Sequence, residues 1–301
     1  MDRLDELAIL VAVLDAGSLQ GAARRLRRSP PAVTRGLAAL ERRVGARLFQ
    51  RSTRRLAPTA AGLALAGQAR ALLDGFQVLL QDGGAAAETV AGMLRVTAPV
   101  VFGRLHVLPV LASFLQRHAA LRAELLLSDR PQDLIAEGLD VALRIGPMPD
   151  SGLVARRLGQ VRRVLVASPN YLAAHGTPGT PSDLAGHALI YTAARPGPVT
   201  WRLRHGGRER SLRLTPRLWV NEVEAALDAA RQNHGIASAL SYQVAEDLAG
   251  GRLVRLLRAA ESAPLPVRLV WPGGATAAAR VRRFVDHATE TLAQLDVLRE
   301  T

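Results

Sequence analysis

The 301-residue sequence contains no cysteine and no lysine. Without cysteine the chain has neither disulfide bonds nor thiolate metal ligands, which fits a reducing cytoplasm. Without lysine, all 39 of its basic side chains are arginine, whose planar guanidinium forms paired hydrogen bonds with phosphate and with guanine edges. The sequence therefore excludes one class of metal site and makes arginine the cation to follow.

The sequence also lacks the motifs of common catalytic sites. It has no glycine-rich phosphate loop, no Gly-x-Ser-x-Gly elbow and no His-Glu-x-x-His, and its seven dispersed histidines show no metal-ligand spacing. No segment has the pattern of a membrane span, and acids precede the first apolar run where a secretory signal has basic residues. We expect a cytoplasmic protein that is not an enzyme, with no cofactor, no metal and no membrane association.

Positive charge is concentrated in one short segment. The chain has a net charge of +13 and is 49% hydrophobic, which is enough for two or more domains with real cores. Residues 21–60 contain one acid, Glu41, and eleven arginines, at positions 24, 25, 27, 28, 35, 42, 43, 47, 51, 54 and 55. This concentration is the electrostatic footprint of a surface that binds phosphate.

Within the basic segment, residues 18–37 have the pattern of two short helices joined by a tight turn. Ser18 and Ser29 are suited to cap the two helices, and Pro30 and Pro31 suit the first turn of the second one. Apolar residues recur at helical spacing at Val33, Leu37, Leu40 and Val44. They leave Thr34 and Arg35 facing outward, as in a helix-turn-helix that places side chains in a DNA major groove.

An opening helix and a small β wing flank this motif. Leu4 to Leu14 mark one apolar face of a helix that ends at Gly17. Residues 50–56 are expected to form a wing with Ser52, Thr53 and Arg54 at its tip, where arginine enters the narrow minor groove. The alternative interpretation of the wing is a solvated basic loop.

A long helix is expected from Thr59, its N-cap. Its apolar residues follow a heptad spacing of 4, 3, 4, 3, which predicts pairing with another helix along its length. A dimer would present two DNA readers one helical turn apart, and the alternative is packing against the chain's own body. The heptad residues are Leu65, Ala69, Leu72, Phe76 and Leu79, and residues 82–92 follow as a linker.

After Met93, short apolar strands alternate with helices, which predicts an α/β domain. Turns that follow strands, such as residues 97–102, are the expected ligand positions in such a domain. The expected strands are residues 94–97, 124–127, 141–145, 164–167, 189–191, 218–220, 236–239 and 267–270. The expected helices are residues 102–118, 131–137, 222–232 and 277–295, with a kink or late start at Pro109.

Four segments resemble the LysR-type transcriptional regulators. They are the helix Leu-Asp-Glu-Leu-Ala-Ile-Leu-Val-Ala-Val-Leu, Ala-Ala-Arg-Arg-Leu followed by Ser-Pro-Pro-Ala-Val-Thr-Arg, Leu-Glu-Arg-Arg-Val-Gly-Ala-Arg-Leu-Phe, and Pro-Thr-Ala-Ala-Gly. Later segments, such as Leu-Asp-Val-Ala-Leu-Arg-Ile-Gly from Leu139, resemble the effector domain of the family branch with Arg-Ile-Gly after the third strand. The resemblance covers nearly the whole chain.

The resemblance implies a winged helix-turn-helix, a long linker helix and two Rossmann-like α/β subdomains, as in a type 2 periplasmic binding protein. The domains would be 1–58 for DNA binding, 59–90 for linkage and dimerisation, and 91–301 for effector binding. Subdomain I would comprise residues 93–161 and 267–301, and subdomain II residues 162–266, with an effector between them and two crossover strands joining them.

The resemblance also implies site residues. Its DNA contacts fall on Arg28, Ser29, Pro30, Pro31, Thr34, Arg35, Arg51 and Arg54. Its effector contacts fall on Thr97, Pro99, Val100, Val101, Phe102, Ser128, Arg144, Ile145, Gly146, Thr200, Trp201 and Asn221. Arg144 and the turn after Thr97 favour an organic anion, unless Arg144 pairs with a neighbouring acid.

We therefore expect a sequence-specific regulator of transcription that binds double-stranded DNA as a homodimer or homotetramer and responds to a small-molecule effector. This interpretation leaves RNA polymerase open as a further partner. Two rivals remain, a solute-binding protein fused to a basic domain and a non-specific nucleoid protein.

Overall fold

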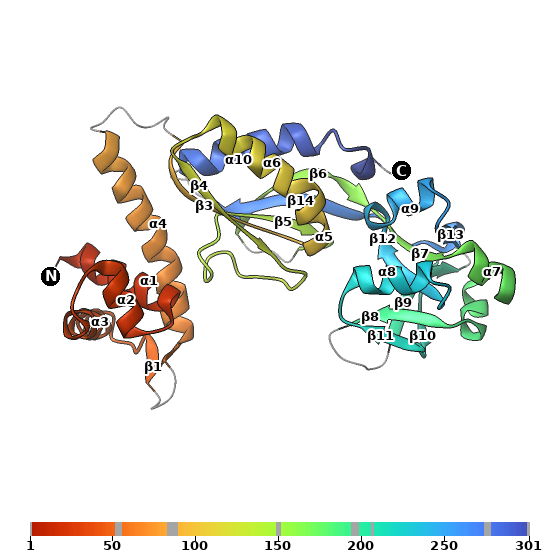
Figure 1. Ribbon diagram of the computed structural model, residues 1–301, viewed down its shortest axis with the longest axis horizontal. Coiled ribbons are helices and arrows are strands. Elements are labelled where there is room, and N and C mark those ends of the chain that lie inside the picture. Colours follow the sequence, from red (N-terminus) through yellow and green to blue (C-terminus); the bar gives the residue numbers. More distant parts are fainter. Residues whose placement is uncertain are drawn as a thin grey trace. The chain divides into compact units, whose positions relative to one another are not determined.

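The protein is described by a computed structural model, which covers residues 2–51, 56–82, 90–148, 152–193, 199–205, 208–273 and 278–299 (Figure 1). The chain forms two compact units. Unit 1 comprises Met1–Arg144, Asp150–Arg156 and Leu269–Leu292, and unit 2 comprises Ile145–Pro149, Arg157–Arg268 and Ala293–Thr301. The chain passes from one unit to the other within strands β6 and β14.

Three helices begin unit 1, as the sequence predicts. α1 (Arg3–Ala16) ends at Gly17, which adopts the left-handed conformation with φ 61°. α2 (Leu19–Leu26) begins after Ser18, whose hydroxyl accepts a hydrogen bond from the Gly21 amide at 3.0 Å. α3 (Pro30–Val44) follows a short turn and ends at Gly45. The three helices share one core, formed by Ile9, Leu10, Ala12, Val13, Ala22, Ala23, Val33, Leu37 and Leu40 together with Leu48, Phe49 and Ala66.

Two details of α3 differ from expectation. Ser29 occupies the N-cap position, but its side chain caps no amide of residues 30–44. Pro31 at the second helical position has no amide hydrogen to donate, and the Ala32 amide at the third donates to the Ser29 carbonyl instead, at 2.9 Å. Val44, expected on the buried face, is 44% exposed, because the chain turns away at Gly45 and Leu48 fills the core.

The predicted wing is present at its base. β1 (Phe49–Arg51) and β2 (Leu56–Pro58) pair antiparallel. Glu41 fixes the entry to β1, because its carboxylate accepts hydrogen bonds from the amides of Leu48 (2.8 Å) and Phe49 (3.3 Å). The expected tip, with Arg54, lies outside the described residues.

The long helix α4 (Ala60–Asp82) begins where the sequence predicts. The Thr59 hydroxyl accepts from the Gly62 amide at 3.0 Å and donates to the Arg47 carbonyl at 2.8 Å. α4 packs against α1 and contacts β3. Most of the expected linker, residues 83–89, lies outside the described residues.

The first α/β sheet has the strand order β4-β3-β5-β14-β6. β3 pairs parallel with both β4 and β5. α6 and α10 pack together through Phe114 and Phe284, whose ring centroids are 5.4 Å apart. The elements are β3 (Gly92–Ala98), α5 (Val100–Phe102), α6 (Leu108–Arg117), β4 (Leu121–Leu127), β5 (Val141–Ile145), β6 (Leu153–Val161), β14 (Leu265–Pro272) and α10 (Ala279–Leu292).

The late start expected at Pro109 within helix 102–118 is confirmed, because α6 begins at Leu108 with Pro109 in its first turn. The residues before α6 form α5 and a π-helical turn over Gly103–Val107. The helix expected over 131–137 is wrong, since residues 131–133 are irregular and residues 134–138 form turns. The Asp133 carboxylate accepts from the amides of Ile135 (3.0 Å) and Ala136 (3.1 Å), a local bond that competes with a helix.

Unit 2 contains a second sheet, in the order β11-β8-β12-β7-β13. α8 packs against one face with Val164, Val166 and Ile190, and the hairpin β9–β10 and α7 supply side chains to a second cluster around Leu165 and Leu189. The elements are β7 (Arg163–Ala167), α7 (Pro169–His175), β8 (Leu189–Thr192), β9 (Val199–His205), β10 (Arg208–Leu214), β11 (Leu218–Val220), α8 (Val223–Arg231), β12 (Ile236–Leu240), α9 (Ala245–Ala249) and β13 (Val254–Leu256). Short 3-10 turns span Pro181–Gly186, Ser241–Gln243, Arg258–Ala260 and Asp296–Leu298.

Candidate functional site

The leading end of α3 is an exposed part of the helix-turn-helix. Val33 and Leu37 are fully buried and fix one face of α3 in the core. Pro30 and Pro31 are exposed at the start of the helix, and Arg35 is exposed on the face opposite the core. The Thr34 hydroxyl donates to the Pro30 carbonyl at 3.0 Å. This end of α3 is therefore uncrowded and carries a cation.

Acids of α1 pair with some of the arginines around this end. Arg28 donates to Asp5 at 2.7 Å, Arg43 pairs with Glu6 at 3.2 Å, and Arg25 pairs with Asp15 at 3.1 Å. The hydrogen bond from Arg28 lowers the pKa of Asp5 below its usual value. The sequence count of eleven arginines against one acid therefore overstates the free charge, because the partner acids lie earlier in the chain.

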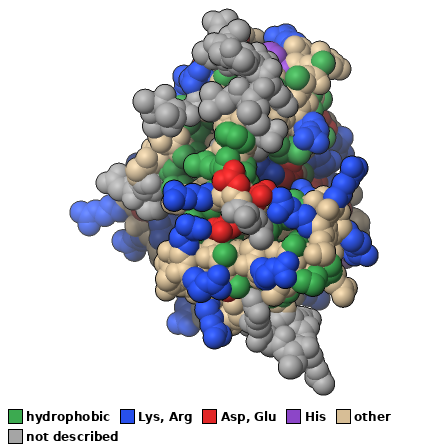
Figure 2. All heavy atoms as spheres, turned by 90° about the vertical axis from the view of Figure 1, so that its left-hand side faces the viewer, with side chains coloured by type: hydrophobic (Ala, Val, Ile, Leu, Met, Phe, Trp, Pro, Cys, Tyr) green, Lys and Arg blue, Asp and Glu red, His purple; other side chains and the backbone are tan. Residues whose placement is uncertain are grey.

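Other arginines of the segment remain exposed. Arg24, Arg27, Arg35, Arg42 and Arg47 are all exposed, and they form no ion pair with the described residues. Arginine side chains lie across the face shown in Figure 2, with a small group of acids among them. Of the two predicted wing contacts, Arg54 and the side chain of Arg51 lie outside the described part of the structure.

The turn after β3 contains residues of the expected effector site. Thr97 is buried, and its hydroxyl donates to the Gln132 side-chain oxygen at 2.8 Å. The Val100 amide donates to Asp129 at 3.1 Å. Val101 and Phe102 are core residues, only 2% and 0% exposed. The accessible part of this turn is therefore Pro99 and Val100.

Ser128 follows β4 and Arg144 lies near the end of β5, the two strands that flank β3. The Ser128 amide donates to the Ala98 carbonyl at 2.9 Å, at the end of β3. The Arg144 guanidinium donates to the backbone carbonyl of Gln132. Burial lowers the pKa of Arg144, and the nearby Glu137 carboxylate acts in the opposite direction. Gln132 thus bonds to both Thr97 and Arg144. Its role could not be predicted, since a single glutamine in a turn has no recognisable sequence pattern.

The remaining expected effector residues belong to unit 2. Gly146, which directly follows Ile145, has φ 103°, and its amide donates to the Pro266 carbonyl at 2.9 Å. Trp201 is 5% exposed within the core of unit 2, whereas the neighbouring Thr200 is exposed. Asn221 is exposed directly after β11.

Three further polar groups of unit 2 lie on adjacent strands. The hydroxyls of Thr192 and Ser238 and the indole N–H of Trp219 are buried, and no described residue bonds to them. They belong to β8, β12 and β11. Buried polar groups in native proteins are normally satisfied, so these atoms are suited to a polar ligand.

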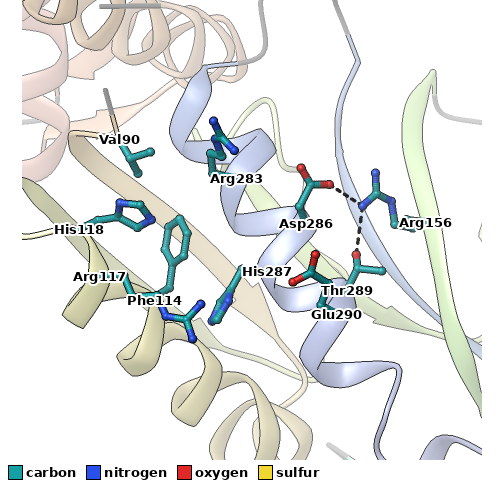
Figure 3. A pocket seen from close by; sticks show the side chains of 10 residues that line it. All are labelled: Val90, Phe114, Arg117, His118, Arg156, Arg283, Asp286, His287, Thr289 and Glu290. Carbon is teal, nitrogen blue, oxygen red and sulfur yellow. Dashed lines mark hydrogen bonds and ion pairs between the residues drawn. The ribbon is translucent and has the colours of Figure 1, made fainter. Parts of the chain in front are cut away.

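A separate hollow of about 550 Å³ lies between α6 and α10 in unit 1 (Figure 3). Arg156 donates to Asp286 at 2.8 Å there, and His287 lies 2.8 Å from the Ser113 hydroxyl. Burial and the charge of Arg117 lower the pKa of His287. The expected effector residues do not line this hollow.

The heptad residues of α4 divide into two groups. Leu65 packs against the core of the three helices and Ala69 is 2% exposed, so the chain itself covers this half. Leu72 and Phe76 are 52% and 38% exposed. The side chain of Leu79 lies outside the described residues.

Two features of the described residues bear on other functions. They contain no group of three or more histidine, aspartate or glutamate side chains placed to hold a metal ion. None of the described helices combines the length and the hydropathy that crossing a membrane requires.

Comparison with known proteins agrees with this architecture. Residues 4–63 match the model of the bacterial regulatory helix-turn-helix protein, lysR family, and residues 87–293 match the LysR substrate binding domain. The chain is 33% identical over 299 residues to the probable HTH-type transcriptional regulator LtrA of Klebsiella pneumoniae. The aligned region covers 98% of this chain and 97% of LtrA.

Solved structures of full-length regulators are also similar. CrgA, a LysR-type transcriptional regulator from Neisseria meningitidis, has a TM-score of 0.61 and 30% identity, over 96% of this chain and 98% of CrgA. AphB, a Vibrio cholerae virulence activator, has a TM-score of 0.63 and 26% identity, over 96% of this chain and 99% of AphB. The effector-binding domain of LysR-type transcriptional regulators lies C-terminal to the DNA-binding domain, as here. With its helix-turn-helix, wing, long helix and two α/β sheets, the chain belongs to the LysR-type transcriptional regulators.

Proposed function

We propose that the leading end of α3 reads base edges in the major groove, with Arg35 as the principal reader and Pro30, Pro31 and Thr34 beside it. One observation carries this assignment. Val33 and Leu37 bury one face of α3, while Arg35 on the opposite face is exposed and forms no ion pair with the described residues. An exposed arginine at this position of a helix-turn-helix is suited to bidentate contact with guanine.

The surrounding residues would fix the position of α3 on the duplex. Exposed Arg27, Arg42 and Arg47 are suited to phosphate contacts, which give affinity without sequence preference. Arg28 and Ser29 lie in the turn before α3, and Arg28 would exchange its bond with Asp5 for one with phosphate. Arg51 and Arg54 of the wing would contact the backbone and the minor groove.

Selection from a random duplex pool tests this assignment. Full-length protein should enrich one sequence, and the Arg35→Ala variant should lose that preference while still retaining duplexes at low salt. Equal retention of all sequences by the wild-type chain would contradict sequence-specific reading and favour the non-specific nucleoid protein.

We further propose that the effector is a small organic anion. Arg144 is the partly buried cation at the end of β5, and Ser128, Pro99 and Val100 lie at the ends of neighbouring elements of unit 1. The other residues proposed as effector contacts, Ile145, Gly146, Thr200 and Asn221, belong to unit 2. The buried Val101, Phe102 and Trp201 would support these contacts from the core.

A panel of mono- and dicarboxylates tests the anion. A carboxylate present at a hundred times its dissociation constant should stabilise the full chain by about 2.7 kcal/mol, seen as a raised melting temperature. Arg144→Gln should abolish this shift. A shift of equal size with the uncharged amide of the same compound would contradict the anion.

The exposed Leu72 and Phe76 of α4 would pair with a second copy of the chain, giving a homodimer that could assemble further into a homotetramer. The protein would work in the cytoplasm beside its DNA, with RNA polymerase as the partner that receives the signal, and it would not act as an enzyme.

A further inference from the structure

Asp15, near the end of α1, receives two arginines from different helices. Arg25 of α2 pairs with one carboxylate oxygen at 3.1 Å, and Arg70 of α4 pairs with the other. The side chains of Asp15 and Arg70 are only 19% and 12% exposed, so water screens this ion pair less than a surface pair. The two ion pairs of Asp15 thus link α4 to α2 of the helix-turn-helix.

The same Arg70 side chain also reaches the turns that follow β4. Its Nη1 donates to the backbone carbonyl of Glu137 at 3.5 Å. A Cβ built on Gly138 would lie 3.1 Å from Arg70, and a Cβ on Gly67 would overlap the carbonyl oxygen of Ile135. Gly67 is therefore required for α4 to approach so closely. We call Gly67 and Arg70, together with residues 135–138, the α4–loop contact.

Residues 131–140 are held firmly on the first sheet. Leu134 and Leu139 form a buried cluster with Ala142 of β5. The Asp140 carboxylate accepts from the amide of Arg95 in β3 at 2.9 Å. The segment is thus anchored on the first sheet from Leu134 to Asp140, and Gln132 lies only two residues before the first anchored side chain.

Gln132 opens this segment and contacts two residues of the proposed effector site. Its side chain accepts from Thr97, and its backbone carbonyl accepts from Arg144. The Thr97 hydroxyl has a single proton to donate, so a ligand that accepts this proton must displace the Gln132 side-chain oxygen. A ligand that takes the Arg144 N–H bonding to the Gln132 carbonyl displaces Gln132 in the same way. Ligand binding at these residues thus acts directly on the segment that touches α4.

We propose that the α4–loop contact transmits the state of Thr97 and Arg144 through Gln132 to Arg70, and from Arg70 through Asp15 to the helix-turn-helix. This inference rests on the proposed function, because it takes Thr97 and Arg144 as effector residues and α3 as the DNA reader. It adds a defined intrachain route from the effector residues to α3. Such a route must be tested by measuring energetic coupling, because proximity of the residues alone does not establish it.

Two glycines of α4 allow a matched test of the contact. Gly67→Ala and Gly75→Ala make the same change in the same helix, but a Cβ on Gly75 meets no atom within 4 Å. In hydrogen exchange of the full-length chain, Gly67→Ala should speed exchange of the amides of residues 135–139 about tenfold relative to Gly75→Ala. Arg70→Gln, which removes both charged bonds, should have the same effect. Equal exchange in all three variants would overturn the contact.

A double-mutant cycle tests the transmission. The probe is the duplex that the wild-type protein enriches from a random pool, and the perturbation is Gln132→Ala. In the otherwise native chain this change should alter the dissociation constant by at least about fivefold, the lower end of typical allosteric coupling. In the Gly67→Ala background the same change should have an effect of less than about twofold, because the route is already broken.

An equal effect of Gln132→Ala in both backgrounds, or none in the native chain, would refute the transmission. If the wild-type chain enriches no duplex, the proposed DNA reading fails. The exchange comparison of Gly67→Ala with Gly75→Ala still decides the contact in that case, so the two failures are distinguishable.

Discussion

Replacing Arg35 by alanine tests the DNA-reading surface at its centre. The side chain is exposed on α3 and forms no ion pair with the described residues, so its removal should change the free energy of unfolding by less than about 0.5 kcal/mol. A bidentate contact between arginine and guanine contributes about 1–3 kcal/mol of discrimination, which corresponds to a loss of about 5- to 150-fold in affinity for the preferred duplex.

Fluorescence anisotropy with the preferred duplex and a scrambled duplex measures the effect. Arg35→Ala should weaken the first complex far more than the second. Arg42→Ala is the matched control, since Arg42 is an exposed arginine farther along the same helix. Its loss should weaken both complexes equally and reduce the salt slope by about one. If Arg35→Ala also weakens both complexes equally, Arg35 contacts phosphate and the assignment of α3 is wrong.

Three further outcomes are expected. Arg54→Ala should reduce the preference for A·T-rich flanking sequence in binding assays, because arginine favours the narrow minor groove, and unchanged binding across flanks would remove the wing from the reader. Phe76→Asp should give a monomer in sedimentation, since it places a charge in the proposed dimer interface at Leu72 and Phe76 of α4. The control variant Gln68→Asp, at an exposed position of the same helix, should leave the dimer intact. A dimer that survives Phe76→Asp contradicts the interface. Burial alone would raise the pKa of Asp247, but hydrogen bonds from Arg231 and Arg252 outweigh the effect of burial and lower the pKa below its ordinary value of 3.8. The stability that this pair provides is therefore present above about pH 4 and lost as the pH falls through the folded pKa. Asp247→Asn should lower the free energy of unfolding at pH 7 by about 1–3 kcal/mol, measured with denaturant. It should also reduce the loss of stability at acid pH. An unchanged loss at acid pH would show that Asp247 does not contribute to it.

Local signals in the sequence predicted the DNA-binding end well. Capping at Ser18 and Gly17 depends on neighbouring residues alone, and the structure confirms both. The ion pairs of Arg25, Arg28 and Arg43 were not foreseen, because their partner acids lie on α1 and only the packing of the helices brings them together.

The α/β region shows the limits of apolar periodicity. The strands β9 and β10 were missed because arginines alternate with apolar residues along them, so neither contains a continuous apolar run. The helix predicted at 131–137 was wrong because the Asp133 side chain bonds the amides that a helix would use. The role of Gln132 could not be predicted either, since its two partners lie 35 and 12 residues away in the chain.

A nuclease footprint of the purified full-length protein on a duplex carrying its enriched sequence tests the central claim most directly. Two readers on one dimer should protect two half-sites whose centres lie about 10–10.5 base pairs, or a multiple of that, apart. Raising the salt should weaken the protection steeply. Absence of any protected region at low ionic strength, or uniform protection along the duplex, would contradict the assignment of this protein as a sequence-specific reader of DNA.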